Sequence, residues 1–182
     1  QHEYMIKELK TALLYKAPFF ASIMFERSRI HLATPQEING TAKYPDGSTK
    51  EVSATVHTWQ GMPISTAMTD GYNIVFNPEF LSGITLSERI FVACHEVFHL
   101  MARHPRRFHY YSQMGIGGKK FDHKTANIAA DAVINKCLRD ASIGKQTEGG
   151  VHLEQELYDN YGYTLLGTEA WETVYDLLVQ GG

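Results

Sequence analysis

Cysteine is scarce in this sequence, which has only Cys94 and Cys137. One disulfide between them is conceivable, but two cysteines cannot build a disulfide-rich secreted scaffold. The sequence also has no apolar run near the ~20 residues that a membrane-spanning helix needs, and residues 1–10 are polar and unlike a signal peptide. These absences favour a cytoplasmic protein that has no membrane partner.

Positive charge is not in excess either. The 17 lysines and arginines are outnumbered by 20 aspartates and glutamates, which gives a net charge of -3. Proteins dedicated to nucleic acids are normally clearly basic, so we expect no nucleic-acid partner. The 182 residues, 43% of them hydrophobic, are enough for one domain with its own core, and we predict a single domain over residues 1–182.

Hydrophobic periodicity and turn residues divide the first half of the chain. Apolar residues at helical spacing indicate a helix, alternating apolar residues indicate strands, and clusters of glycine, proline, asparagine and aspartate indicate turns. The predicted elements are a helix over 2–17 ended by Pro18, a strand or second helix over 22–32, turns over 34–53 with a hairpin at 45–47, and β-structure over 52–76 with a tight turn at Asp70-Gly71. Residues 34–59 are interpreted as an inserted loop or hairpin.

The second half predicts helices. Thr85 and Glu88 form a capping-box pattern that opens a helix running to about His104, where Pro105 blocks continuation. Further helices are predicted over 125–139 and 168–179, with loops over 106–120 and 144–150. Together these elements predict an α+β fold in which helices surround a small antiparallel sheet.

Histidine is plentiful, and five of the nine histidines lie between residues 95 and 123. His95, Glu96 and His99 form an HExxH motif inside the predicted helix. Residues four apart lie about 5–6 Å apart on one helix face, so both imidazoles can reach one metal ion. Glu96 is rotated by ~100° from His95 and can contact a metal-bound water without being a ligand. This arrangement is typical of zinc hydrolases, in which the glutamate acts as general base.

The surroundings of the motif are apolar, so its helix is expected to lie in the core. Two imidazoles and a carboxylate are costly to bury without a shared partner, which favours a metal site. The alternative is that His95 and His99 are partly buried residues that bond only to the backbone.

Catalytic zinc usually has three protein ligands and a water, so a third ligand is needed. Asp131 is the preferred candidate because Asn127, Asp131 and Asn135 form a polar stripe on an otherwise apolar helix. A second helix that supplies a carboxylate, followed one turn later by a polar residue, resembles the thermolysin-like plan. Asn135, with Asn127, would then support the ligands by hydrogen bonding.

Alternative ligands or oxyanion donors lie between the two metal helices. His104 would face away from His99 if the helix continued unbroken. The position of His123 in the sequence gives no reason to choose it as a ligand. Peptide hydrolysis also needs a donor for the oxyanion, for which His109, Tyr110, Tyr111 and His123 are equal candidates. Residues 72–76 could form the sheet edge that pairs with an extended substrate.

Three sequence blocks together resemble a known family. They are residues 69–80, residues 94–99 with 103–105, and residues 127–135. In this order they resemble the zincin-like metallopeptidase domain found N-terminal to von Willebrand factor A-like domains in bacterial and phage proteins. The resemblance implies a zincin-like fold and zinc-dependent peptidase activity, but no particular substrate. A phage-encoded member would act in the host cytoplasm.

The expected function is therefore a zinc peptidase with one Zn²⁺ per chain, held by His95, His99 and Asp131, with Glu96 as general base. Its partner would be a protein or peptide substrate. Because no von Willebrand-type domain follows residue 182, a partner protein is expected to take that place. The alternatives are a non-catalytic binding or adaptor protein stabilised by metal, and a metal-dependent amidase acting on a non-protein amide.

Overall fold

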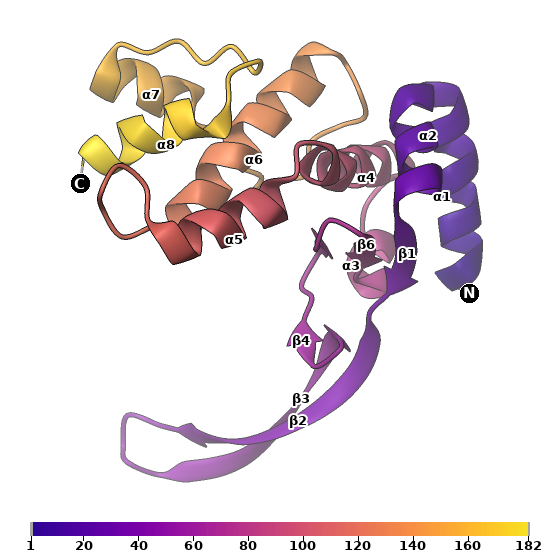
Figure 1. Ribbon diagram of the computed structural model, residues 1–182. Helices are drawn as coiled ribbons and strands as arrows, with labels where there is room; N and C mark the ends of the chain where they lie inside the picture. Colours follow the sequence, from indigo (N-terminus) through magenta and orange to yellow (C-terminus); the bar gives the residue numbers. More distant parts are fainter. Residues whose placement is uncertain (1, 182) are drawn as a thin grey trace.

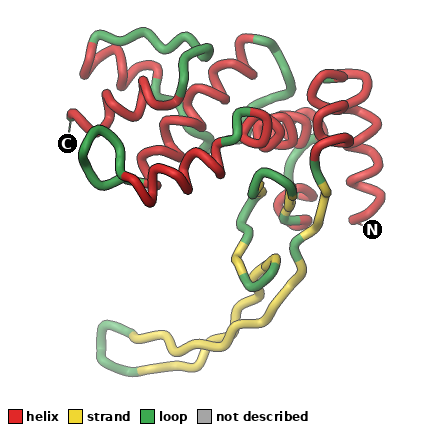
Figure 2. Tube along the Cα trace, in the orientation of Figure 1, coloured by secondary structure: helices red, strands yellow, loops and turns green. Residues whose placement is uncertain are grey.

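The computed structural model describes residues 2–181 as a mixed α/β fold with small sheets, which agrees with the predicted α+β class. Figure 1 shows helices gathered in one part of the molecule and a long two-stranded ribbon projecting from it, and Figure 2 shows the same division by secondary structure. None of the helices among these residues is long and apolar enough to pass through a membrane.

The chain begins with two helices that lie side by side, α1 (His2–Lys16) and α2 (Pro18–Arg27) (Figure 1). Pro18 occupies the first turn of α2, where its missing N–H costs nothing, so it separates the helices as predicted. The ambiguous segment 22–32 contains both predicted structures, because α2 ends at Arg27 and strand β1 (Arg29–Leu32) follows.

The projecting ribbon consists of β2 (Thr34–Lys43) and β3 (Thr49–Trp59), with the short β4 (Met62–Pro63) at its base. Its two long strands are antiparallel and pair from Thr34 with Thr58 to Lys43 with Thr49. The hairpin predicted at residues 45–47 is present, but the turns predicted over most of 34–53 are wrong. Proline, asparagine and glycine suggested turns there, whereas pairing with the second strand makes the segment extended.

A second sheet has the order β1-β6-β5, with β5 spanning Ala67–Thr69 and β6 spanning Asn73–Phe76. The sheet is mixed rather than antiparallel as predicted, because β1 enters parallel to β6 while β5 is antiparallel to it. The prediction that residues 72–76 form an edge is also wrong. The strand β6 is central, its last three residues are buried, and β1 and β5 form the two edges.

After the short helix α3 (Pro78–Ser82) comes α4 (Leu86–Met101), whose first turn has the predicted capping box between Thr85 and Glu88. This helix ends three residues earlier than predicted. Arg103 adopts the left-handed conformation, with φ 56°, and a new helix α5 (His104–Met114) begins. The loop predicted over 106–120 is therefore wrong in its first part, because Pro105 starts a helix instead of ending one.

Three helices complete the fold, α6 (His123–Asp140), α7 (Glu154–Tyr161) and α8 (Trp171–Gln180). The first and last were predicted within a few residues. The helix α7 was not, because its eight residues are mostly polar and only Leu157 is buried. Ile134 and Leu138 of α6 join the core formed around α1, α2 and α4, while Ala129 and Val133 join a second core around α8. The helix α6 thus runs between two cores.

Candidate metal centre

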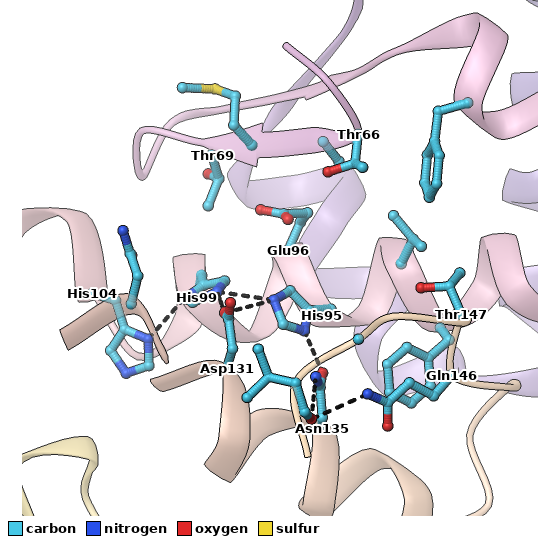
Figure 3. Close-up of a pocket in the computed structure, with 18 of the residues that line it drawn as sticks. Thr66, Thr69, His95, Glu96, His99, His104, Asp131, Asn135, Gln146 and Thr147 are labelled. Carbon is cyan, nitrogen blue, oxygen red and sulfur yellow. Dashed lines mark hydrogen bonds and ion pairs between the residues drawn. The ribbon is translucent and has the colours of Figure 1, made fainter. Parts of the chain in front are cut away.

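The helices α4 and α6 bring three potential ligand atoms together. His95 Nε2 lies 3.0 Å from Asp131 Oδ1, His99 Nε2 lies 2.9 Å from the same oxygen, and the two Nε2 atoms are 3.1 Å apart (Figure 3). Four-residue spacing on α4 stacks the two histidines, and α6 supplies the carboxylate from across the cleft. The structure thus assembles the three residues predicted as ligands, and among the described residues it forms a cluster able to hold a metal ion.

The chemistry of this donor set fits a divalent cation. Ligand atoms around a tetrahedral ion with bonds of 2.0–2.1 Å lie about 3.3 Å from each other, close to the spacings seen here. One carboxylate oxygen and two ring nitrogens converge, so one bound ion would contact all three atoms at once. Two imidazoles and one carboxylate are also a ligand set found in catalytic zinc sites.

His95 is oriented by Asn135. Its Nδ1 lies 2.7 Å from Asn135 Oδ1, while the Asn135 amide nitrogen donates to the carbonyl of Val151 at 3.3 Å. Because the amide nitrogen is engaged by a carbonyl, Oδ1 is the acceptor and His95 Nδ1–H is the donor. Nε2 is then the ring nitrogen that faces Asp131, and it offers its lone pair to a metal ion when its own proton is released. Asn135 therefore stands in the supporting position predicted for it.

His104 supports the second histidine, which the sequence did not indicate. The helix does not continue unbroken, as the expectation that His104 faces away from His99 required, because the left-handed residue Arg103 ends it first. His104 Nδ1 lies 2.9 Å from His99 Nδ1, and its ring stacks on Phe108 with an interplanar angle of 6°. Contact is made on the side of His99 away from the cluster, so His104 lies behind the three donors and is not one of them. Burial lowers the pKa of His104 to about 3, so its ring is neutral and can accept the Nδ1–H of His99.

The electrostatics of the cluster favour a shared positive charge. Burial alone would raise the pKa of Asp131, but the hydrogen bonds from His95 and His99 hold it well below its usual value. Burial opposes charge on His95, yet the pKa of its ring is raised to about 9 because Asp131 faces it. A carboxylate kept ionised between two imidazoles is a favourable environment for a cation.

Glu96 is buried, with 8% of its surface exposed, on the side of α4 that faces Thr66 and Thr69 (Figure 3). Burial raises the pKa of its carboxyl group, an effect opposed by the nearby His95 and His99. A glutamate with a raised pKa is a better proton acceptor and donor near neutral pH than an exposed one. Glu96 therefore stands beside the donor cluster, in the position the HExxH spacing predicts.

The cluster lies in a cleft of about 740 Å³. One wall is the edge strand β5, and the opposite side includes His104, His123 and the polar face of α6 with Asn127. Tyr110, a predicted oxyanion donor, is 58% exposed on α5 and lines a separate small hollow beside Arg103. His123 was placed in a loop by the sequence and is instead the first residue of α6.

A family model described as "Putative metallopeptidase domain" matches residues 51–176. The chain belongs to this family. The match covers α4 and α6 with the whole donor cluster, and it begins inside β3 and ends inside α8. No curated protein and no solved structure matches the chain.

Membership of a metallopeptidase family agrees with the resemblance seen in the sequence, and it implies a metal cofactor. Two walls of the cleft in this family member were not predicted. They are the edge residues 66–69 and the loop 146–151, in which Gln146 donates to the same Val151 carbonyl as Asn135. Neither carries a motif, because only the tertiary fold places them beside α4.

Proposed function

We propose that this chain is a zinc-dependent peptidase with a zincin-like active site. His95, His99 and Asp131 would hold the ion, and Glu96 would act as general base. The observation that carries the proposal is the convergence of His95 Nε2, His99 Nε2 and Asp131 Oδ1 within 3.1 Å of one another. A buried carboxylate that is not one of these donors lies beside them, and a structural site has no need of it.

The donor types favour zinc. Imidazole nitrogen with one carboxylate oxygen suits zinc better than magnesium or calcium, which prefer oxygen ligands alone. When bound, zinc lowers the pKa of a coordinated water towards ~7 and polarises a carbonyl oxygen. The chain contributes two rings oriented by Asn135 and His104, so that their Nε2 lone pairs face the same point.

Glu96 would handle the proton. Its carboxylate accepts a proton from the attacking water as the carbonyl carbon is attacked, and it then delivers the proton to the leaving amine. The raised pKa of Glu96 suits both steps, since the group must gain and lose a proton near neutral pH. His123 lines the same cleft and is the remaining candidate donor to the oxyanion.

The substrate would bind as an extended strand along β5. Among residues 2–181, β5 pairs only with β6, so its other edge is open, and Ala67, Met68 and Thr69 line the cleft. Backbone pairing at an open edge holds a peptide without requiring a particular sequence. The edge lies opposite the face of α4 that carries Glu96 (Figure 3).

Metal content and cleavage test this proposal together. We expect about one zinc per chain by elemental analysis, and cleavage of an unfolded protein substrate. Glu96→Gln should keep the zinc and lower kcat by about 10²- to 10⁴-fold. Asp131→Ala should lose zinc, whereas Asp140→Ala, a matched change on the same helix away from the cluster, should keep it.

Two outcomes would reject the proposal. Undiminished zinc in Asp131→Ala would refute the ligand assignment, and full activity in Glu96→Gln would refute the mechanism. Cleavage of a non-peptide amide in place of peptides would assign the same site to an amidase.

A further inference from the structure

The catalytic cleft does not end at the donor cluster. A second hollow of about 510 Å³ adjoins it, and Pro105 lines both. Along one wall, β5 lines the first cleft and the turn 70–72 that follows it lines the second. Along the other wall, His95 and His99 line the first cleft and Leu100 and Met101 line the second. A strand lying on β5 would therefore pass from the catalytic centre into the second hollow.

Three arginines line this second hollow, Arg27, Arg103 and Arg106. Each is exposed, and none forms an ion pair with any residue in the described range 2–181. The neighbouring Arg107 differs, because it pairs with Glu172 and lies over the ring of Trp171. We refer to Arg27, Arg103 and Arg106 as the arginine subsite.

Negative charge in the hollow offsets only part of the positive charge of the subsite, since three arginines face two acids. Its two acids are Glu26 and Asp70. Both carboxylate oxygens of Asp70 form hydrogen bonds within its own turn. Oδ1 accepts from the backbone N–H groups of Tyr72 and Asn73, and Oδ2 accepts from the Asn73 side-chain amide. Two of the arginines, Arg103 and Arg106, also stand at the N-terminal end of α5, where the helix dipole disfavours cations. A bound anion would offset the unfavourable interaction between these two cations and the positive end of the helix dipole.

We propose that the arginine subsite binds acidic side chains of the peptide substrate, several residues away from the bond that is cleaved. This inference rests on the proposed peptidase function and names the class of substrate. Each residue of an extended strand advances ~3.3 Å, and three positions separate Thr69 from Tyr72, so the acidic residues lie roughly three to five residues from the scissile bond. For a peptide that pairs antiparallel with β5, the acidic residues lie on the N-terminal side of the scissile bond, because β5 runs toward the subsite.

Binding without turnover tests the subsite. The zinc-loaded Glu96→Gln chain is titrated into fluorescein-labelled peptides that share an apolar centre and differ only near the N-terminus, with Asp-Glu, Asn-Gln or Lys-Lys there. Fluorescence anisotropy should give about 3- to 10-fold tighter binding of the acidic peptide at low salt, as expected for two or three exposed ion pairs. The preference should fade at high ionic strength.

Variants assign the effect to the subsite. Arg103→Gln with Arg106→Gln should remove the preference for the acidic peptide and leave binding of the Asn-Gln peptide unchanged. Lys43→Gln with Lys50→Gln removes the same charge from the projecting ribbon and should leave the preference intact. Arg27→Gln alone, on α2, should reduce the preference without touching the α4–α5 break, and so serves if the double variant fails to fold.

The outcomes separate this inference from the proposed function. Equal affinity for the acidic and the amide peptide, or an equal loss in the lysine control, overturns the subsite. A fourth peptide, with Asp-Glu moved to the C-terminal side of the apolar centre, tests the direction, and tighter binding of that peptide than of the N-terminal one overturns it. Because binding is measured in a variant that need not cleave, an arginine-dependent preference in a chain without peptidase activity would leave the subsite standing and reject only the peptidase.

Discussion

His104 Nδ1 lies 2.9 Å from His99 Nδ1, across the break between α4 and α5. One of these two nitrogens must carry the proton that lies between them. If His99 binds a metal through its Nε2, that nitrogen must keep a lone pair, so the proton of the His99 ring is on Nδ1 and His104 Nδ1 accepts it. The pKa of the His104 ring is lowered to about 3 by burial, which keeps that ring a neutral acceptor. The break in the helix therefore determines the tautomer of a proposed metal ligand.

We expect His104→Ala to weaken zinc binding by about 10- to 100-fold, the usual effect of removing a partner behind a metal ligand. His104→Asn, which keeps an acceptor near the same place, should recover part of the loss, while His104→Phe should not. Competition with a chromophoric chelator measures the affinity without any need for activity. Equal affinities in all three variants would mean that His104 only fills space.

Asn135 makes the corresponding contact to His95, and it also donates to Val151. Asn135→Leu should weaken zinc binding by a similar factor, since the Nδ1–H of His95 loses its acceptor. Asn135→Asp keeps the acceptor and should retain most of the affinity. Asn127→Leu, one helical turn before Asp131 on the same polar stripe, should have little effect because Asn127 is exposed. A larger loss in Asn127→Leu than in Asn135→Leu would contradict the assignment.

Metal removal should destabilise the fold. A ligand that binds only the folded chain raises its unfolding free energy, so chelation should lower Tm and stoichiometric zinc should restore it. Magnesium should not restore it, because two of the three donors are imidazole nitrogens. Differential scanning calorimetry measures both steps, and a Tm that does not change on chelation would argue against a resident ion.

A pH-dependent contribution to stability is expected from Glu169, which lies outside the candidate metal centre. Its carboxylate accepts from the Tyr163 hydroxyl and from the backbone N–H groups of Leu166 and Gly167. Burial alone would raise the pKa of Glu169, but these hydrogen bonds lower it. Because the folded pKa is depressed, the stabilisation is present above the unfolded value of about 4.3 and is lost as the pH falls through the folded value.

Glu169→Gln should therefore lower the unfolding free energy at pH 7 by roughly 0.5–1 kcal/mol, and the difference from the unmodified chain should shrink below about pH 4. Urea unfolding at several pH values measures it. Glu51→Gln, on the exposed face of β3, is the matched control and should change little at any pH. A Glu169→Gln difference that grows on acidification would show the opposite linkage.

The features of the site that depend only on residues close together in the sequence were predicted. The capping box at Thr85 and the four-residue spacing of His95 and His99 are helical properties, and both are found where expected. Asp131 and Asn135 followed from a polar stripe on one helix face. The start of α5 could not be predicted in the same way, because Pro105 ends a helix or begins one according to the conformation of Arg103 before it.

Other features depend on distant pairing. Residues 34–43 contain turn-forming residues, and only their pairing with β3 makes them a strand. Residues 72–76 were predicted to form an edge of the sheet, but β6 pairs with β5 on one side and with β1 on the other, so it is the central strand. The hollow with the arginine subsite is lined by α2, the turn after β5 and the start of α5, which no single stretch of sequence reveals.

The position of α6 between two cores has a mechanical consequence. His95 and His99 belong to α4, whose apolar side chains pack in one core, while Asp131 lies on the part of α6 where Ala129 and Val133 pack in the other. Because Ile134 and Leu138 of the same helix stay with the core of α4, a motion that spreads the two cores would pull Asp131 away from the two rings only by bending α6 near residues 131–134. Opening the cleft and releasing the ion would then be one movement, and an occupied site would act as a latch across the seam.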